Sequence, residues 1–188
     1  MSTVRAVRYL SIDEYLINER HSENRHEYID GEVFAMAGAS RAHNRIAGNL
    51  FTALDLHLRS TPCRAFISDM KVRVNNRFYY PDVLVSCTDI ADEPDDYYET
   101  APCLIIEVLS ESTESDDQKH KRLAYQQLPS LQEYVLAAQT EPRIEVYRRQ
   151  EKSWIIETYA SDDSVYFQSI DLTLIISEIY RDVFSSGY

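Results

Sequence analysis

Glycine, cysteine and tryptophan are scarce in this chain of 188 residues, which has four, three and one of them respectively. With so few glycines, a phosphate-binding glycine loop has little room in the sequence. No apolar run approaches the roughly 20 residues that a membrane-spanning helix needs. The first ten residues carry two arginines and no apolar core segment, so we expect no secretory signal. These absences favour a cytoplasmic protein that does not insert into a membrane.

The three cysteines, Cys63, Cys87 and Cys103, are odd in number and widely spaced. They stand in apolar or strand-like segments, and the five histidines do not fall at zinc-binding spacing. We therefore predict reduced, mostly buried thiols, as is usual in a cytoplasmic protein, and neither a disulfide framework nor a zinc site.

Basic residues are absent from one long segment, and that absence explains the net charge of −12. Residues 82–117 hold twelve Asp or Glu and no Lys or Arg, so the charges of the remaining chain sum to zero. Residues 41–81, in contrast, hold seven Lys or Arg against two Asp. Because charges more than about 8 Å apart are largely screened at physiological salt, a local basic face can meet nucleic-acid phosphates despite the acidic total. A mixed, solvated surface explains the same arginines equally well.

Helical and strand-like patterns alternate along the chain, which is long enough for one well-packed domain. Apolar periodicity and capping residues predict helices from Ser11 to Glu19, from Ser40 to Leu58 and from Asp116 to Gln127. The stretch HEYIDGEVFAM predicts a hairpin that turns at Asp30-Gly31. Further strand-like or apolar runs lie at 64–74, 79–87, 103–109, 133–138, 143–149, 154–159 and 172–176, before a last amphipathic turn at 179–184. This order predicts a single α/β domain with a central mixed β-sheet flanked by helices.

Two carboxylates stand in strands that are apolar on both sides of the alternation. Asp82 opens the strand in YYPDVLVSC, and Glu107 lies near the end of the strand in CLIIEVLS. Such strands lie centrally in a sheet, where an unpaired charge is costly unless it meets a counter-charge or a metal. Two carboxylates that meet at one end of a sheet suit Mg²⁺, which also keeps waters and accepts phosphate oxygens. Turn chemistry at Pro81-Asp82 and an ordinary structural glutamate are the alternative interpretations.

Lys121 supplies an amine on the helix that follows Glu107. At 100° per residue it points within about 40° of the centre of the apolar side of that helix, whereas Lys119 points almost opposite. Lys121 therefore faces the sheet, and its long stem can bring the ammonium group to the carboxylates. Asp117 lies on the same side of the helix. A simple ion pair of Lys121 with Asp117, four residues earlier, is the alternative.

Together these residues resemble the active-site layout of the PD-(D/E)XK nuclease superfamily, a Pro-Asp followed after about 25 residues by a Glu in an apolar strand. The superfamily expects lysine two residues after that Glu; this chain has Leu109 there, and Lys121 offers a relocated amine. The blocks HEYIDGEVFAMAGASRAHNRIAGNL, YYPDVLVSC and EVLSESTESDDQKHKRLAYQQLPSLQEYVLAAQ are similar to the Uma-type restriction endonucleases, a family abundant in cyanobacteria. The similarity extends over about residues 11–180, the expected core of a single domain spanning 1–188.

The resemblance implies a restriction-endonuclease-like fold and a Mg²⁺- or Mn²⁺-dependent endonuclease that hydrolyses DNA. By their positions, Asp82 and Glu107 would hold the metal, together with the carbonyl of Val108. Lys121 would orient or activate the attacking water and offset charge on the phosphate. Asp117 matches an acidic position of the family that could fix Lys121.

Three questions stay open at the level of the sequence. His43 matches a family histidine and lies on the buried face of its predicted helix, so it is either a core residue or a supporting group that reaches the cleft. Leu109 and the acidic total favour an alternative function, a non-catalytic nucleic-acid-binding or protein-interaction module, and an enzyme acting on another phosphate substrate is a third. The apolar strands after residue 130 fit a homodimer face and burial within the monomer equally well.

Overall fold

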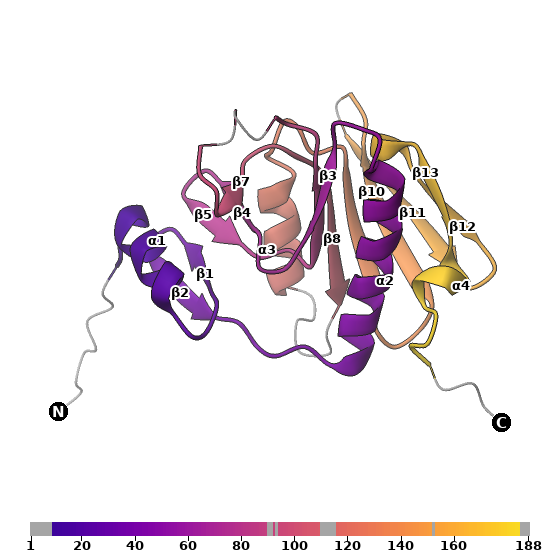
Figure 1. The fold of residues 1–188 in the computed structure, drawn as a ribbon, viewed down its shortest axis with the longest axis horizontal. Helices are drawn as coiled ribbons and strands as arrows, with labels where there is room; N and C mark the ends of the chain where they lie inside the picture. Colours follow the sequence, from indigo (N-terminus) through magenta and orange to yellow (C-terminus); the bar gives the residue numbers. More distant parts are fainter. Residues whose placement is uncertain (1–8, 90–91, 93, 110–115, 152, 185–188) are drawn as a thin grey trace.

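The computed structural model describes residues 9–89, 92, 94–109, 116–151 and 153–184 (Figure 1). Its larger sheet is mixed and has six strands in the order β11-β10-β9-β8-β6-β3. These strands are β3 (Arg64–Ile67), β6 (Val83–Ser86), β8 (Pro102–Leu109), β9 (Glu133–Ala138), β10 (Arg143–Arg149) and β11 (Trp154–Ala160). Strands β8 and β9 run parallel, and the other neighbours run antiparallel. The predicted central mixed sheet is confirmed.

A second sheet has five short strands in the order β2-β1-β5-β4-β7. They are β1 (His26–Ile29), β2 (Glu32–Ala35), β4 (Lys71–Val74), β5 (Arg77–Tyr79) and β7 (Tyr98–Glu99). The predicted hairpin is β1–β2, and its two turn residues, Asp30 and Gly31, have φ angles of 50° and 104°. Two-residue hairpin turns of this kind need positive φ at both positions, which explains the Asp-Gly pair. A separate two-stranded hairpin is formed by β12 (Ser164–Phe167) and β13 (Leu172–Ile175). Neither β7 nor β12 was predicted.

The three predicted helices are confirmed. Helix α1 (Ile12–His21) begins with a reciprocal capping box between Ser11 and Glu14, and the side chain of Ser40 caps α2 (Arg41–Leu58). Helix α3 (Asp116–Tyr125) follows β8, and the short α4 (Ile176–Ile179) starts earlier than the predicted last turn. Among the described residues, no helix combines the length and apolarity that crossing a bilayer requires.

Helices cover the larger sheet on both faces, with α2 and α3 on opposite sides of β8 (Figure 1). On the α2 side, Ile46 and Leu50 pack in one buried cluster with Val85 and Ile106. On the α3 side, a second cluster includes Ala124, Tyr125, Leu84 and Ile105. Alternate residues of β6 and β8 thus enter different cores, which is why both strands read as continuously apolar. The end of β8 lies beside the start of α2 (Figure 1).

Two of the predicted strands are each divided in the structure. Residues 64–74 form β3 and β4, which belong to different sheets, and residues 79–87 contain the end of β5 and all of β6. Pro81 lies between β5 and β6 and has no N–H for a strand ladder. The chain crosses from one sheet to the other between β3 and β4 and again between β5 and β6. A hydrogen bond joins these two segments, since the N–H of Ser68 donates to the carbonyl of Asp82 at 3.2 Å. Asp82 therefore lies at a crossing, directly before β6.

The prediction of three reduced thiols was wrong, because Cys63 and Cys87 form a disulfide. Their neighbours, Arg64 and Ser86, form a pair in the antiparallel β3–β6 ladder, so the two cysteines stand opposite each other where the strands end. They are 24 positions apart in the chain, and only the strand pairing brings them together. Cys103 is a free, buried thiol.

Candidate active site

The pairing of β6 with β8 brings Asp82 and Glu107 to the same end of the larger sheet. The antiparallel register pairs Val83 with Ile106, so the next step along both strands places Asp82 opposite Glu107. The N–H of Val108 donates to Oδ2 of Asp82 at 2.7 Å, which fixes this carboxylate against β8. The two predicted acids thus meet at one end of two adjacent strands, Asp82 directly before β6 and Glu107 within β8.

His43 approaches the same carboxylate from the first turn of α2. Its Nε2 lies 3.2 Å from Oδ2 of Asp82, and both side chains are 16% exposed. The Ser40 hydroxyl accepts from the His43 N–H and so fixes the start of the helix. The hydrogen bond to Asp82 raises the pKa of His43, as does one to the backbone of Val108, while burial acts in the opposite direction. Of the two sequence interpretations, the structure favours the one in which His43 reaches the predicted site, although its role stays a prediction.

Glu107 lies in a buried environment that also contains charged groups of both signs. Burial raises the pKa of its carboxyl group to about 8, and the charges of Asp82 and Glu27 act in the same direction. The ammonium of Lys121 and a hydrogen bond from Tyr125 lower this pKa. That bond runs from the hydroxyl of Tyr125, a fully buried residue of α3, to Oε1 of Glu107 at 3.0 Å. The Glu107 carboxyl is therefore largely protonated at neutral pH unless another positive charge joins the cluster.

Lys121 pairs with a carboxylate that the sequence patterns did not single out. Its Nζ lies 2.7 Å from Oε1 of Glu27 in β1, and these side chains are 16% and 10% exposed. The same oxygen of Glu27 accepts from the N–H of Tyr80 at 3.3 Å. An acid inside a strand was the reason to select Glu107, and it applies to Glu27 as well. The short strands of the hairpin that contains Glu27, however, are not apolar on both sides of the alternation, so the sequence did not indicate that Glu27 is buried.

The remaining positions considered from the sequence are Lys119, Leu109, Asp117 and Val108. Lys119 is exposed, consistent with its predicted direction, and Leu109 is half-buried against the α3-side core. Asp117 belongs to α3, but its side chain lies outside the described part of the structure, so the predicted pair with Lys121 is not tested. The N–H of Val108 donates to Asp82, and the role of the Val108 carbonyl as a metal ligand stays a prediction.

The donor set of this cluster fits a hard divalent cation. Carboxylate oxygens are the ligands that Mg²⁺ prefers, and a bound cation would favour the charged form of Glu107, which burial and the neighbouring carboxylates disfavour. Among the described residues, no three Asp, Glu, His or Cys side chains form a ready-made metal site. Mg²⁺ needs only one or two carboxylates, because water and substrate phosphate fill its other positions. Asp82 and Glu107 therefore suit a two-carboxylate magnesium site.

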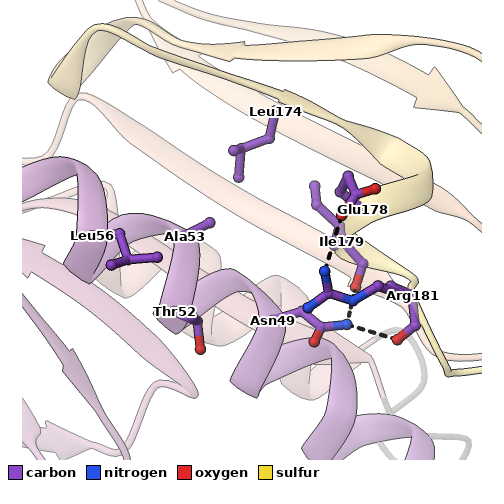
Figure 2. Close-up of a pocket in the computed structure, with 8 residues that line it drawn as sticks. All are labelled: Asn49, Thr52, Ala53, Leu56, Leu174, Glu178, Ile179 and Arg181. Carbon is purple, nitrogen blue, oxygen red and sulfur yellow. Dashed lines mark hydrogen bonds and ion pairs between the residues drawn. The ribbon is translucent and has the colours of Figure 1, made fainter.

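A separate pocket lies between α2 and the segment formed by β13 and α4 (Figure 2). Leu56 and Leu174 contribute to its lining. The side-chain amide of Asn49 donates to the carbonyls of Ile179 and Arg181, each at 2.9 Å. These bonds attach the C-terminal segment to α2. The pocket contains no residue of the predicted site, and we assign it no catalytic role.

Residues 12–175 match the model of the Uma2 family, which is described as "Putative restriction endonuclease". The chain belongs to the Uma2 family. Two uncharacterized proteins of Synechocystis sp. (strain ATCC 27184 / PCC 6803 / Kazusa) are similar to it. One, slr1290, is 38% identical over 175 residues, which are 92% of each chain. The other, sll1609, is 35% identical over 164 residues, which are 83% of this chain and 90% of that relative.

The fold of this Uma2 protein is also found in a crystal structure at 1.96 Å resolution from Anabaena variabilis ATCC 29413, a "putative nuclease belonging to DUF820". The two structures superpose with a TM-score of 0.74 and 21% sequence identity, over 93% of this chain and 99% of that chain. The predicted family and the predicted restriction-endonuclease-like fold are confirmed.

Proposed function

We propose that this Uma2 protein is a Mg²⁺-dependent endodeoxyribonuclease that hydrolyses phosphodiester bonds of DNA. The observation that carries the proposal is the arrangement around Glu107. Asp82 lies directly before β6, at the position opposite Glu107, and the charge of Lys121 acts on the Glu107 carboxyl group. The description of the family and the name of the Anabaena protein support the same class of reaction.

Asp82 and Glu107 would be the metal-holding residues, and each has a neighbour that fixes its orientation. The Val108 N–H and the His43 ring contact one oxygen of Asp82, and Tyr125 contacts one oxygen of Glu107. When bound, Mg²⁺ lowers the pKa of its water and acts as a Lewis acid at the phosphate. Preorganised carboxylates would keep the site ready for the cation without large side-chain movement.

Lys121 would contact the scissile phosphate. Its ammonium lies on Glu27 in the structure, and the oxygens of a phosphate would compete for the same three N–H donors. In the transition state a positive charge there offsets the negative charge that develops on the phosphate. Glu27 would hold the amine at the site between turnovers, and Lys121 could also orient the attacking water.

DNA would meet a smaller basic surface than the sequence indicates. Of the basic residues in 41–81, several are engaged within the protein or buried, namely Arg59 with Asp55, Arg77 with Asp30, Arg64 and Arg73 with backbone carbonyls, and Lys71. Arg41 and Arg45 are exposed in the first two turns of α2, the helix whose His43 contacts Asp82. We therefore propose that these two arginines contact phosphates that flank the scissile one.

The direct test is calorimetric titration of Mg²⁺ and Mn²⁺ into the wild type and Asp82→Asn, followed by incubation with supercoiled plasmid. We expect the wild type to bind metal and to nick the plasmid, and the variant to lose both properties. Absence of binding at millimolar metal together with intact plasmid would reject the proposal and favour a non-catalytic module. Metal binding without nicking would indicate a different phosphate substrate.

Three further expectations stay predictions that accompany this proposal: a single domain over residues 1–188, a cytoplasmic location, and a homodimer that cuts both DNA strands. Limited proteolysis tests the first, and light scattering after gel filtration tests the third. A protein that is monomeric with and without DNA would cut the two strands in separate events.

A further inference from the structure

The three cysteines of the chain gather at one place. Sγ of Cys103 in β8 lies 3.6 Å from Sγ of Cys87, which is itself bonded to Cys63. Cys87 is exposed, Cys63 is half-buried and Cys103 is buried. The cluster lies at the opposite end of β6 and β8 from Asp82 and Glu107, so it is no part of the proposed active site.

An irregularity in the sheet positions the free thiol. The β6–β8 register pairs Val85 with Leu104 but Ser86 with Pro102, so Cys103 is an extra residue on β8. A β-bulge of this kind re-aims a side chain relative to the regular alternation. The Cys103 thiol donates to the carbonyl of Val85 at 3.4 Å, which holds its sulfur against β6. The backbone itself therefore places a thiol in contact with a disulfide.

We propose that Cys63, Cys87 and Cys103 form a thiol–disulfide exchange site, in which Cys87 bonds to either of the other two. The thiolate of Cys103 attacks Sγ of Cys87, and the bond from Cys87 to Cys63 breaks. Cys63 leaves as a thiolate and takes up the proton that Cys103 released. One disulfide is broken and one is formed, so the exchange needs neither oxidant nor reductant.

The exchange moves a cross-link within the larger sheet. In one state the disulfide joins β3 to β6, and in the other it joins β6 to β8 and leaves a half-buried thiol at Cys63. Burial raises the pKa of Cys103 to about 11, so little of its thiolate exists at neutral pH. Attack by Cys103 is therefore slow at neutral pH, and Cys63–Cys87 is the pairing found in the structure. Disulfides of cytosolic proteins are usually transient or redox-sensing. A disulfide that the neighbouring Cys103 thiol can attack would be of this exchangeable kind.

The pairing in the wild type can be mapped after acid quenching, alkylation and digestion. Trypsin is unsuitable, because residues 82–117 contain no Lys or Arg and both Cys87 and Cys103 stay on one peptide. A protease that cuts at Asp or Glu separates them, since both residue types lie between the two cysteines. We expect a major Cys63–Cys87 peptide and a minor Cys87–Cys103 peptide, and loss of the minor one in Cys103→Ser. A wild type without the minor peptide, even after prolonged incubation at pH 9, would contradict the proposal.

Cys63→Ser gives a second, independent test, because it removes the present partner of Cys87. Mild oxidation with diamide should close Cys87 to Cys103 within one molecule and remove both free thiols. Cys87→Ser is the matched control, and both of its thiols should persist under the same treatment. The exchange site is refuted if Cys63→Ser has the circular dichroism spectrum of the wild type yet keeps both thiols or links only between molecules. A Cys63–Cys103 bond in the control would equally refute the central position of Cys87.

Discussion

The ammonium of Lys121 in α3 lies 2.7 Å from a carboxylate oxygen of Glu27 in β1. The pair connects the smaller sheet to the helix that covers the larger one. It also holds a positive charge where it acts on Glu107. A lysine that the nuclease superfamily carries on a strand is thus replaced, in this proposal, by one on a helix with its own acidic partner.

Replacing Lys121 with Ala should reduce plasmid nicking by at least about 100-fold, because the phosphate loses its positive neighbour. The change also leaves Glu27 without this partner, and we expect a loss of about 1–3 kcal/mol in the free energy of unfolding. Nicking should therefore be measured at a temperature where thermal melting shows the variant to be folded. Lys119→Ala is the matched control, since Lys119 is exposed on the same helix, and it should stay within about twofold of the wild type. Equal losses in both variants would remove Lys121 from the mechanism.

Leu109→Lys should restore part of the activity when it is combined with Lys121→Ala. Position 109 follows Glu107 by two residues on β8, so both side chains lie on the same face of the strand, and Leu109 packs on the α3 side. We expect the double variant to nick plasmid at least about tenfold faster than Lys121→Ala. Leu109→Met with Lys121→Ala controls for repacking and should give no recovery. Failure of a folded double variant to recover would show that the amine must come from α3.

Metal affinity should rise with pH up to about 8 and then level off. The pKa of Glu107 is raised to about 8, so at lower pH a proton must leave before the carboxylate can bind a cation. Calorimetry in buffers of different ionisation enthalpy should count nearly one proton released at pH 6 and none at pH 9. In Tyr125→Phe the hydrogen bond that lowers this pKa is lost, and the plateau should move to higher pH. A pH-independent affinity between 6 and 9 would exclude Glu107 as a ligand.

Without metal, the stability of the fold should depend on pH in the opposite direction. Between the ordinary pKa of 4.5 and the raised value of about 8, the native protein holds a proton on Glu107 that the unfolded chain has lost. The contribution of this group to the free energy of unfolding therefore decreases as pH rises through that window. Urea denaturation in EDTA at pH 5, 7 and 9 measures the slope. Glu107→Gln should flatten it, and an unchanged slope in that variant would assign the effect to another group.

Replacing both Arg41 and Arg45 with Ala should weaken DNA binding and reduce its dependence on salt. Each phosphate contact contributes about one unit to the slope of log K against log salt, so the double variant should lose about two. Binding is best measured with Asp82→Asn as the background, because cleavage is then suppressed. Arg181→Ala is the control, since Arg181 is exposed but pairs with Glu178. Equal slopes in the two variants would place the DNA elsewhere on the molecule.

Local chemistry explains which parts of the fold the sequence predicts. Ser11, Ser40 and the Asp30-Gly31 turn act on their immediate neighbours, so they fix helix starts and a hairpin without knowledge of the tertiary structure. The division of residues 64–74 into β3 and β4 depends on two sheets that the pattern does not distinguish. Both halves are strand-like in sequence, and only their different partners separate them.

The same distinction applies to the candidate site. Glu107 is noticed because its own strand is apolar on both faces, whereas the burial of Glu27 depends on Tyr80 and Lys121, which are distant in the chain. The disulfide between Cys63 and Cys87 likewise follows from strand pairing. Contacts set by tertiary register are not visible in the order of residues.

The position of Lys121 on a helix has a consequence for how such proteins are recognised. An amine on the strand of its acid keeps a fixed spacing from it, but an amine on the following helix tolerates insertions and deletions in the connecting segment. Searches built on a short acid–lysine interval will pass over chains of this type, whereas a search for the spatial set formed by β1, β6, β8 and α3 will retrieve them. If Lys121 has the proposed role, linear motifs with a fixed acid–lysine interval will undercount proteins that carry this amine on a helix.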